Sequence, residues 1–340
     1  MIAPTPIQPE TVAGPYFEDL EVGMKAPAAP GLTLTEGHAA LHQAILGDRL
    51  RLALDAPLSA AVLGPGPPLA HPGLVWDVAI GQSTLLTQRV VANLFYRGLV
   101  LHRAPRIGDT LRTEVEVVGL RQNSPREGRP ATGLAALRVR TTDQEERLVL
   151  DFWRCAMLPL GDPELQTGRA DDLTAIGAES AAGDLGAWLD GWDLGVYRDA
   201  VAGPHFADLD PGASWRLDSG DLVAGATELA RLSLNVASAH HDAASTSSGQ
   251  RLVYGGHTIG LVCSQVVRCL PSLLTVVGWR SCDHVGPVLE GDTVRTELEL
   301  ERTEPLAAGG GLAHLRARGW ARRGEDEHEV LDWHLIGALA

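Results

Sequence analysis

The sequence predicts an α+β fold built twice in tandem, in which each half is an antiparallel sheet wrapped around a central helix. Three observations predict it. Segments of the first half return in the second half in the same order. The clearest helical pattern in the sequence is followed by segments in which apolar and polar residues alternate, as they do in strands. The chain of 340 residues also has room for two units, since a unit with its own core usually has about 150 residues.

Three pairs of matching segments carry the internal repeat. Residues 14–24 (GPYFEDLEVGM) return as 203–213 (GPHFADLDPGA), 108–117 (GDTLRTEVEV) as 291–300 (GDTVRTELEL), and 149–153 (VLDFW) as 330–334 (VLDWH). The offsets are 189, 183 and 181 residues, so the copies differ by small loop insertions. Two copies indicate a duplicated domain rather than a solenoid.

A change of composition separates the two copies. Residues 161–185 are rich in Gly, Ala, Asp and Ser and show little periodicity, which is typical of a linker. We therefore predict an N-terminal unit at 1–160 and a C-terminal unit at 186–340. A Pro/Gly loop at 64–73 occurs in the first copy only and accounts for much of the drift in offset.

Hydrophobic periodicity predicts the elements of each unit. Apolar and polar residues alternate over 111–117 and 294–300, as in half-buried antiparallel strands. Further strands are predicted at 134–140, 148–156, 313–321 and 328–335. Apolar residues from Ile259 to Leu270 follow helical spacing, and Pro271 ends the run. A helix followed by a sheet that wraps it is the arrangement of the hotdog fold.

Composition and charge exclude several classes of protein. Apolar residues make up 45% and charged residues 21%, as in soluble globular proteins. The net charge is −15 and no Lys/Arg cluster occurs, which argues against nucleic-acid binding. We find no run of 18 apolar residues and, in residues 1–10, no signal-peptide pattern. We expect no membrane segment.

Cysteine usage indicates a reducing compartment. The chain has four cysteines without CxxC spacing, which we interpret as small core residues: Cys155, Cys263, Cys269 and Cys282. Together with the missing signal peptide, this predicts a cytoplasmic protein.

One segment of the second copy resembles a known catalytic signature. Residues 235–242 (NVASAHHD), followed by 251–257 (RLVYGGH), resemble the hydratase signature of the MaoC-like family. That signature is Asp-x-Asn-Pro-x-His, followed by a Gly-containing turn that opens the central helix. His240 lies five residues after Asn235, which is the family's spacing between its catalytic Asp and His. Asn235 replaces the carboxylate and cannot act as a base, but its amide can orient water.

Within this family, the two-domain mesaconyl-CoA hydratases, also called β-methylmalyl-CoA dehydratases, look most similar. The resemblance runs from Gly14 to about Leu339 and includes 230–242, 251–261, 14–23 and 121–124. It implies a tandem double hotdog that reversibly hydrates a short-chain enoyl-CoA, branched and dicarboxylic acyl groups included. No cofactor is implied beyond the CoA or phosphopantetheine thioester that is part of the substrate. The motifs specify the superfamily better than the substrate.

The chemistry of hydration assigns roles to these residues. Adding water to an unsaturated thioester requires a proton acceptor and a site for the negative charge on the thioester oxygen. We predict His240 as the acid/base and Asn235 as the group that positions water. Gly255 and Gly256 open the apolar helix, where free N–H groups meet the positive helix end, and are predicted to hold the oxygen. Further predicted substrate-binding residues are Tyr254, His257, Arg251 and Arg280, with Arg97 as another candidate for the CoA phosphates.

The first copy lacks the imidazole. Asp48 corresponds to Asn235, but Ala53 stands where a histidine is needed. We place the turn that corresponds to 254–257 at Trp76-Asp77-Val78. The N-terminal unit is therefore predicted to be a catalytically silent partner that shapes the acyl pocket, so that one chain forms a pseudo-dimer. A homodimer of such chains is compatible with this, and so is a variant in which Asp48 reaches across to His240.

Other chemistries remain open at this point. Thioester hydrolysis on the same fold is one alternative, and a non-catalytic acyl-thioester-binding partner protein is another, because Asn235 breaks the acid/base pair. A metal site is not predicted, since the histidines and Asp242 lack the regular spacing of zinc ligands. No Gly-x-Ser-x-Gly motif for a serine nucleophile occurs.

Overall fold

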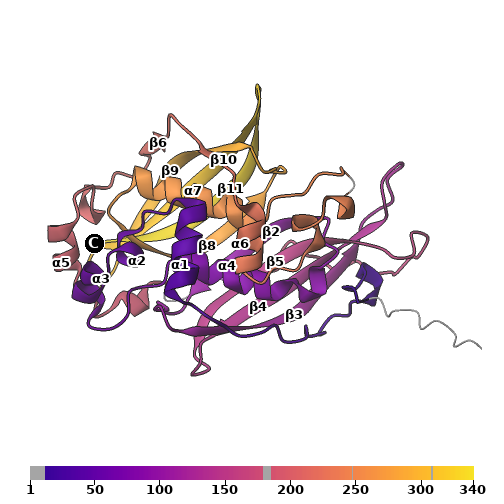
Figure 1. Ribbon diagram of the computed structural model, residues 1–340, viewed down its shortest axis with the longest axis horizontal. Helices are drawn as coiled ribbons and strands as arrows, with labels where there is room; N and C mark the ends of the chain where they lie inside the picture. Colours follow the sequence, from indigo (N-terminus) through magenta and orange to yellow (C-terminus); the bar gives the residue numbers. More distant parts are fainter. Residues whose placement is uncertain (1–11, 179–184, 247, 308) are drawn as a thin grey trace, which may run out of the picture.

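A single antiparallel sheet runs through the whole molecule (Figure 1). The structure is a computed structural model that describes residues 12–178, 185–246, 248–307 and 309–340. Within these residues, eleven strands pair in the order β1-β3-β4-β5-β2-β8-β11-β10-β9-β6, and β7 pairs with β9. The strands are β1 (Leu32–Thr33), β2 (Ala92–Leu101), β3 (Thr110–Gln122), β4 (Thr132–Thr142), β5 (Leu148–Pro159), β6 (Ser214–Arg216), β7 (Asp221–Leu222), β8 (Leu273–His284), β9 (Thr293–Pro305), β10 (Gly311–Arg323) and β11 (Asp326–Leu339).

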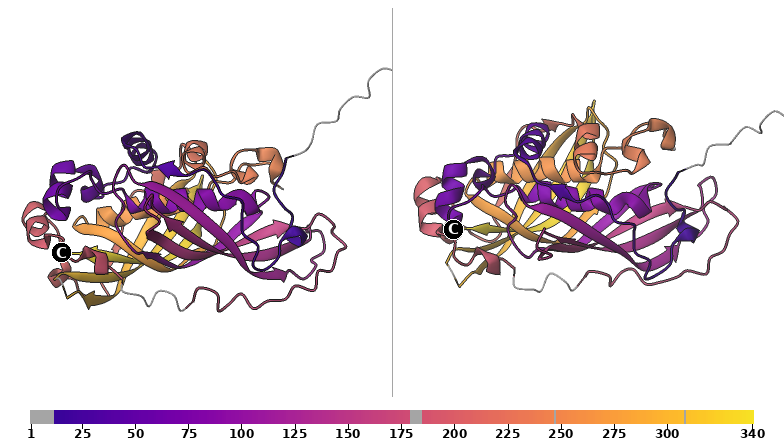
Figure 2. Two further views of the ribbon diagram at one scale, coloured as in Figure 1. Left: turned by 90° about the horizontal axis from the view of Figure 1, so that it is seen from below. Right: turned by 60° about the horizontal axis from the view of Figure 1, so that its bottom comes forward.

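Helices cover one face of this sheet (Figure 2). The α-helices of the described residues are α1 (Glu36–Leu46), α2 (Arg51–Leu54), α3 (Ala56–Leu63), α4 (Pro72–Gln82), α5 (Leu194–Ala200), α6 (Ala226–Leu232) and α7 (Gly255–Cys269). Short 3-10 helices are η1 (Phe17–Asp19), η2 (Ser83–Thr87), η4 (Ala187–Leu189), η5 (Phe206–Asp208), η6 (Ser238–His240) and η7 (Ala243–Ser245). Helices α4 and α7 lie against the sheet, and α1 and α6 lie over them.

The two halves of the chain repeat one arrangement and meet at one strand pair. Strand order β3-β4-β5-β2 in the first half matches β9-β10-β11-β8 in the second. Helix α4 packs on the first set and α7 on the second. Strand β2 pairs antiparallel with β8, with Tyr96 opposite Cys282 and Leu99 opposite Trp279. The predicted double-hotdog architecture is confirmed.

Most of the predicted elements are present. The four strands predicted at 134–140, 148–156, 313–321 and 328–335 lie inside β4, β5, β10 and β11. Burial alternates along β3 as the pattern requires, with Leu111 and Val115 inside and Arg112 and Glu114 outside. Helix α7 begins at Gly255, as predicted, and ends at Cys269, shortly before Pro271.

The expected turn at Trp76-Asp77-Val78 is wrong. These residues lie inside α4, which begins at Pro72 and is buried on every side. A helix buried all round has no apolar stripe, so its period does not stand out in the sequence. Pro suits the first helical position, and His71 caps the helix by accepting the N–H of Gly73 on Nδ1, at 2.9 Å. By the 183-residue offset of the repeat, His71-Pro72-Gly73 is the counterpart of Tyr254-Gly255-Gly256.

The segment after β5 follows the outer face of the sheet, opposite the helices (Figure 2). In residues 160–178, Leu173 and Ile176 pack on Ala136 of β4 and its neighbours. Residues 179–184 of the predicted linker, like residues 1–11, lie outside the described part of the chain. The boundaries at 160 and 186 stay a prediction.

Three tryptophans fill the core between the two units. Trp76 of α4, Trp279 of β8 and Trp333 of β11 are fully buried. Their rings meet edge to face, with centroids 5.0, 5.3 and 6.1 Å apart. Such contacts add about 0.5 to 1.5 kcal/mol each beyond the area they bury. The two units thus share one core as well as one sheet.

One glycine tests the contact between the units. A Cβ at Gly81 of α4 would stand 1.8 Å from the backbone oxygen of Ser233, which follows α6. Backbone cannot move aside as a flexible side chain can, so Gly81→Ala should lower the free energy of unfolding by at least about 2 kcal/mol. The urea midpoint measures this. Gly37→Ala on the exposed start of α1 is the control, and should stabilise by roughly 0.5 kcal/mol; equal effects of the two variants would contradict the contact.

Candidate active site

A cavity of about 310 Å³ lies between the two units. The N-terminal unit lines it with the end of α4, with η2, with the start of β2 and with one residue of β5. The C-terminal unit lines it with the loop at 235–240, the start of α7 and the segment at 284–288. The walls are mostly apolar side chains with a few polar groups, as in sites for small organic ligands.

His240 presents a neutral imidazole to this cavity. Its Nδ1 lies 3.1 Å from the carbonyl oxygen of Leu252, which can only accept, so Nδ1 carries the hydrogen. The other nitrogen, Nε2, makes no hydrogen bond within the described residues and keeps its lone pair. Burial lowers the pKa of His240 to about 4. At neutral pH the side chain is therefore a proton acceptor.

Asn235 lines the same cavity and is only 3% exposed. It follows Leu234, whose left-handed backbone (φ 63°) ends the turn after α6. Its Oδ1 accepts the N–H of Ala237 at 2.9 Å. This bond leaves the Nδ2 amide group free to donate, so the side chain can hold a water by its oxygen but cannot take a proton from it.

The N-terminal unit holds the loop that carries these residues. The N–H of Val236 donates to Thr84 Oγ1 of η2 at 3.0 Å. Both the N–H and the hydroxyl of Ser238 donate to the carbonyl oxygen of Gln88 at 2.9 Å. The loop that carries Asn235 and His240 is therefore positioned by the opposite unit.

Gly255 and Gly256 begin α7, and Gly255 lines the cavity. Neither N–H makes a backbone hydrogen bond within the described residues. The N–H of Gly255, which lines the cavity, can therefore donate to a ligand at the positive end of the helix. A Cβ at Gly255 would stand 2.7 Å from Nε2 of His284, and one at Gly256 would stand 2.1 Å from Oδ1 of Asp77. Both positions therefore require glycine for packing, and Gly256 lies behind the cavity wall.

Tyr254 connects the cavity to the N-terminal unit. Its ring packs against His240, with centroids 5.7 Å apart. Its hydroxyl donates to Oδ1 of Asp77 in α4 at 3.1 Å, and Oδ2 of Asp77 lies 3.2 Å from Nε2 of His42. The side chain is thus fixed from the N-terminal unit, and it serves as a wall of the cavity.

Four predicted or suggested binding residues lie away from the cavity lining. Arg251 pairs with Glu290, and Arg280 pairs with Glu301. Arg97 donates to the carbonyl oxygens of residues 173 and 174. His257 is fully buried in α7, and neither ring nitrogen has a partner among the described residues.

Two cavity residues with basic side chains, His284 and Arg154, escaped the sequence analysis. His284 at the end of β8 has its pKa lowered to about 4 by burial, and nothing in the sequence around it signals a site. Arg154 of β5 was visible in principle, because the alternation Phe152, Arg154, Ala156 puts an arginine on the inward face of an apolar strand.

The corresponding place in the first copy is built differently. Asp48 follows Gly47 (φ 64°) and accepts the N–H of Leu50, which repeats the geometry of Asn235. It lies 2.9 Å from Nε2 of His71 instead of reaching across to His240. Burial raises the pKa of Asp48, but the charge and hydrogen bond of His71 outweigh this and leave it lowered. Asp48 and His71 therefore contact each other inside the fold.

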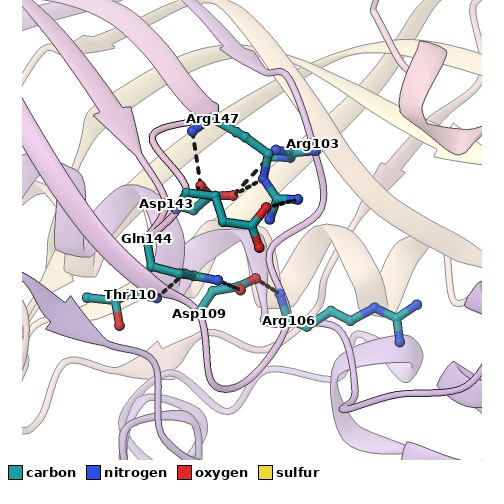
Figure 3. Close-up of polar contacts among 8 residues, drawn as sticks. Arg103, Arg106, Asp109, Thr110, Asp143, Gln144 and Arg147 are labelled. Atoms are coloured by element: carbon teal, nitrogen blue, oxygen red, sulfur yellow. Dashed lines mark hydrogen bonds and ion pairs between the residues drawn. The ribbon is translucent and has the colours of Figure 1, made fainter.

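A second cavity, of about 400 Å³, lies on the surface beyond the far end of β2. Its charged groups satisfy one another (Figure 3): Arg103 and Arg147 donate to Asp143 at 3.4 and 2.8 Å. The N–H of Arg106 donates to Asp109 at 2.8 Å. Its lining holds no histidine, cysteine or hydroxyl group among the described residues. We therefore take the cavity at His240 as the candidate site.

Three further structural findings concern other classes of site. No group of three or more His, Cys, Asp or Glu side chains suited to a metal occurs in the described ranges. None of the helices in that same part of the chain has the length and apolar character needed to cross a membrane. All four cysteines are free thiols.

Comparison with known proteins supports a common origin with acyl-CoA hydro-lyases. No protein-family model matches the chain. Mesaconyl-CoA hydratase of Cereibacter sphaeroides is 29% identical over 90% of this chain and 89% of that protein. Beta-methylmalyl-CoA dehydratase of Chloroflexus aurantiacus is 28% identical over 94% of this chain and 91% of that protein.

Among solved structures, Rv0216 of Mycobacterium tuberculosis, described as a conserved hypothetical protein with a double hotdog fold, is 53% identical with a TM-score of 0.89. The match covers 96% of this chain and 99% of that one. Fold and cavity together define a double-hotdog protein with a cavity between its units. The chain belongs to the same double-hotdog family as Rv0216.

His257 gives a test of these buried histidines. Burial lowers its pKa to about 4, with a smaller effect of the nearby His42, whereas the unfolded chain binds a proton near pH 6.5. Stability should therefore fall as the pH drops from about 6.5 towards 4. The counterpart in the first copy is Leu74, so His257→Leu fits the fold and should remove about 2 kcal/mol of this loss at pH 5.

Urea midpoints of the two proteins at pH 5 and 7.5 measure the effect. The variant and the wild type should be close at pH 7.5, where His257 is neutral in both the folded and the unfolded chain. The same pH dependence in both proteins would show that His257 carries no such penalty.

Proposed function

We propose that this protein catalyses the reversible hydration of a short-chain enoyl-CoA to the 3-hydroxyacyl-CoA. The observation that carries the proposal is that the free Nε2 face of a neutral His240 and the start of α7 border one mostly apolar cavity. Hydration needs both parts: an acceptor for the proton of water, and donors for the charge that develops on the thioester oxygen.

In the proposed reaction, the thioester oxygen accepts the N–H of Gly255 at the positive end of α7. Asn235 holds a water by its oxygen, and Nε2 of His240 takes one of its protons as the oxygen bonds to C3 of the substrate. Electrons move to the thioester oxygen, and the enolate then takes the proton at C2. Since the amide of Asn235 does not ionise, His240 performs both transfers. A pKa near 4 makes the protonated form of His240 a stronger acid than an ordinary imidazolium, which favours the return of the proton.

The curated relatives support a branched, dicarboxylic acyl group, since they are named for mesaconyl-CoA and β-methylmalyl-CoA. Tyr254 forms part of the acyl wall, and Gly256 supports the oxygen site from behind. Arg251 and Arg280 stay candidates for the CoA phosphates, although each already has a carboxylate partner. Four free thiols fit a cytoplasmic location. One chain supplies both units of the site, and a homodimer is not required for it.

His240→Gln tests the proposal. Removing the imidazole should lower kcat on crotonyl-CoA or mesaconyl-CoA by at least ~10²-fold, because general acid–base catalysis contributes that much. Loss of the enoyl thioester absorbance follows the reaction. His38→Gln at the start of α1, away from the cavity, is the matched control and should leave the rate unchanged. Unchanged turnover in the His240 variant would rule out its role.

The same assay separates the alternatives. Release of free CoA thiol by the wild type would indicate thioester hydrolysis instead of hydration. Binding of acyl-CoA without turnover of any substrate would indicate a binding protein, for which the amide of Asn235 in place of a carboxylate would then be the reason.

A further inference from the structure

The cavity contains one charged side chain that nothing in the mechanism uses. Arg154 lines it from β5 of the silent unit. The two histidines of the lining are neutral at pH 7, because burial lowers the pKa of each to about 4. No Asp, Glu or Lys belongs to the lining among the described residues. A site for an anionic substrate such as an acyl-CoA thus has a positive charge deep inside and no negative one.

This charge is buried and has no carboxylate partner. Arg154 is 3% exposed, and none of the described carboxylates lies within 4 Å of it. Its guanidinium donates to Ser83 Oγ at 2.8 Å and to Thr87 Oγ1 at 2.9 Å, and Nε has no partner. Both hydroxyls pass their own hydrogens to backbone carbonyls, so they accept from the arginine without neutralising it. Buried charges in proteins are normally paired.

The duplicated fold shows that its architecture does not need an arginine here. Arg154 is opposite Tyr96 in the pairing of β5 with β2. The offsets of the repeat make Leu335 and Trp279 their counterparts, and these two are likewise opposite each other in β11 and β8. Leu335 is 1% exposed and belongs to the main core. The fold therefore accepts leucine at this position, and the arginine occurs in the copy whose strand pair faces the cavity.

We propose that Arg154 binds a free carboxylate at the far end of the substrate's acyl group, so that the protein selects enoyl thioesters of dicarboxylic acids. This rests on the proposed function. With the thioester oxygen at Gly255 in the C-terminal unit, a short acyl chain extends across the cavity towards β5 in the N-terminal unit. A planar guanidinium with free N–H groups binds a carboxylate in two parallel hydrogen bonds, which a methyl group cannot replace.

A matched pair of substrates tests this. 2-Methylfumaryl-CoA with a free carboxylate and 2-methylbut-2-enoyl-CoA differ only by carboxylate against methyl at the far end. The wild type should prefer the first by at least ~10²-fold in kcat/KM, since sites built to hydrogen-bond a substrate group discriminate strongly against analogues that lack it. Arg154→Leu, which copies Leu335, should abolish that preference and change kcat/KM for the second substrate by less than about 3-fold.

Two further variants control the experiment. Arg154→Lys keeps the charge without the planar fork and should retain an intermediate preference. Arg138→Gln removes an arginine of the adjacent strand β4 that pairs with Asp151, is 40% exposed and does not line the cavity; it should leave the preference unchanged. If Arg154→Leu fails to fold, the preference of the wild type and of Arg154→Lys decides the question.

Calorimetry of the binding of both thioesters separates the proposed hydration activity from the proposed role of Arg154. If the wild type turns over neither substrate but binds the dicarboxylic one at least ~10-fold more tightly, and Arg154→Leu does not, the proposed hydration fails and the role of Arg154 stands. If both are hydrated equally well, or if Arg154→Leu slows both equally, the arginine acts on the thioester or on the fold, and the carboxylate site is refuted.

Discussion

The pairing of β2 with β8 is the interaction on which the rest of the structure depends. It joins two sheets into one and places α4 and α7 side by side, so that each unit closes the open side of the other. The cavity at His240 exists only because this pair brings the start of β2 next to the start of α7. A single unit would leave the loop at 235–240 without the hydrogen bonds that it donates to Thr84 and Gln88 and that hold it in place.

Duplication within one chain allowed the two copies to take different parts. In the first, Asp48 and His71 have become a buried pair that stabilises the turn before α4. In the second, the corresponding turn keeps an amide and a neutral imidazole at a cavity. The N-terminal unit contributes to the candidate site through Asp77, which fixes Tyr254. Burial has different consequences in the two copies: the contact with His71 offsets its effect on the pKa of Asp48 in one, and in the other it leaves His240 as a base with a low pKa.

The sequence predicted those features that depend on local pattern. The repeat, the strands with clear alternation and helix α7 are present because each has one buried face and one exposed face. Helix α4 and strands β2 and β8 were missed because they are buried on both faces and show no period. The spacing of Asn235 and His240 pointed to the cavity. Arg154 and His284 come from strands far away in the sequence, and only the pairing of those strands brings them to it.

The two copies differ at one cross-strand pair, and this difference has a consequence for the evolution of the fold. The pair is Tyr96 with Arg154 in the first copy and Trp279 with Leu335 in the second. A dimer of two C-terminal units joined by the same symmetry would contain His240 twice. However, Trp279 and Leu335 of each unit would fill the space where the ligand of the other unit would lie. Two N-terminal units would have room but no imidazole. The ancestral symmetric dimer can therefore no longer be regenerated from either half, and selection must now act on the two halves as one indivisible unit.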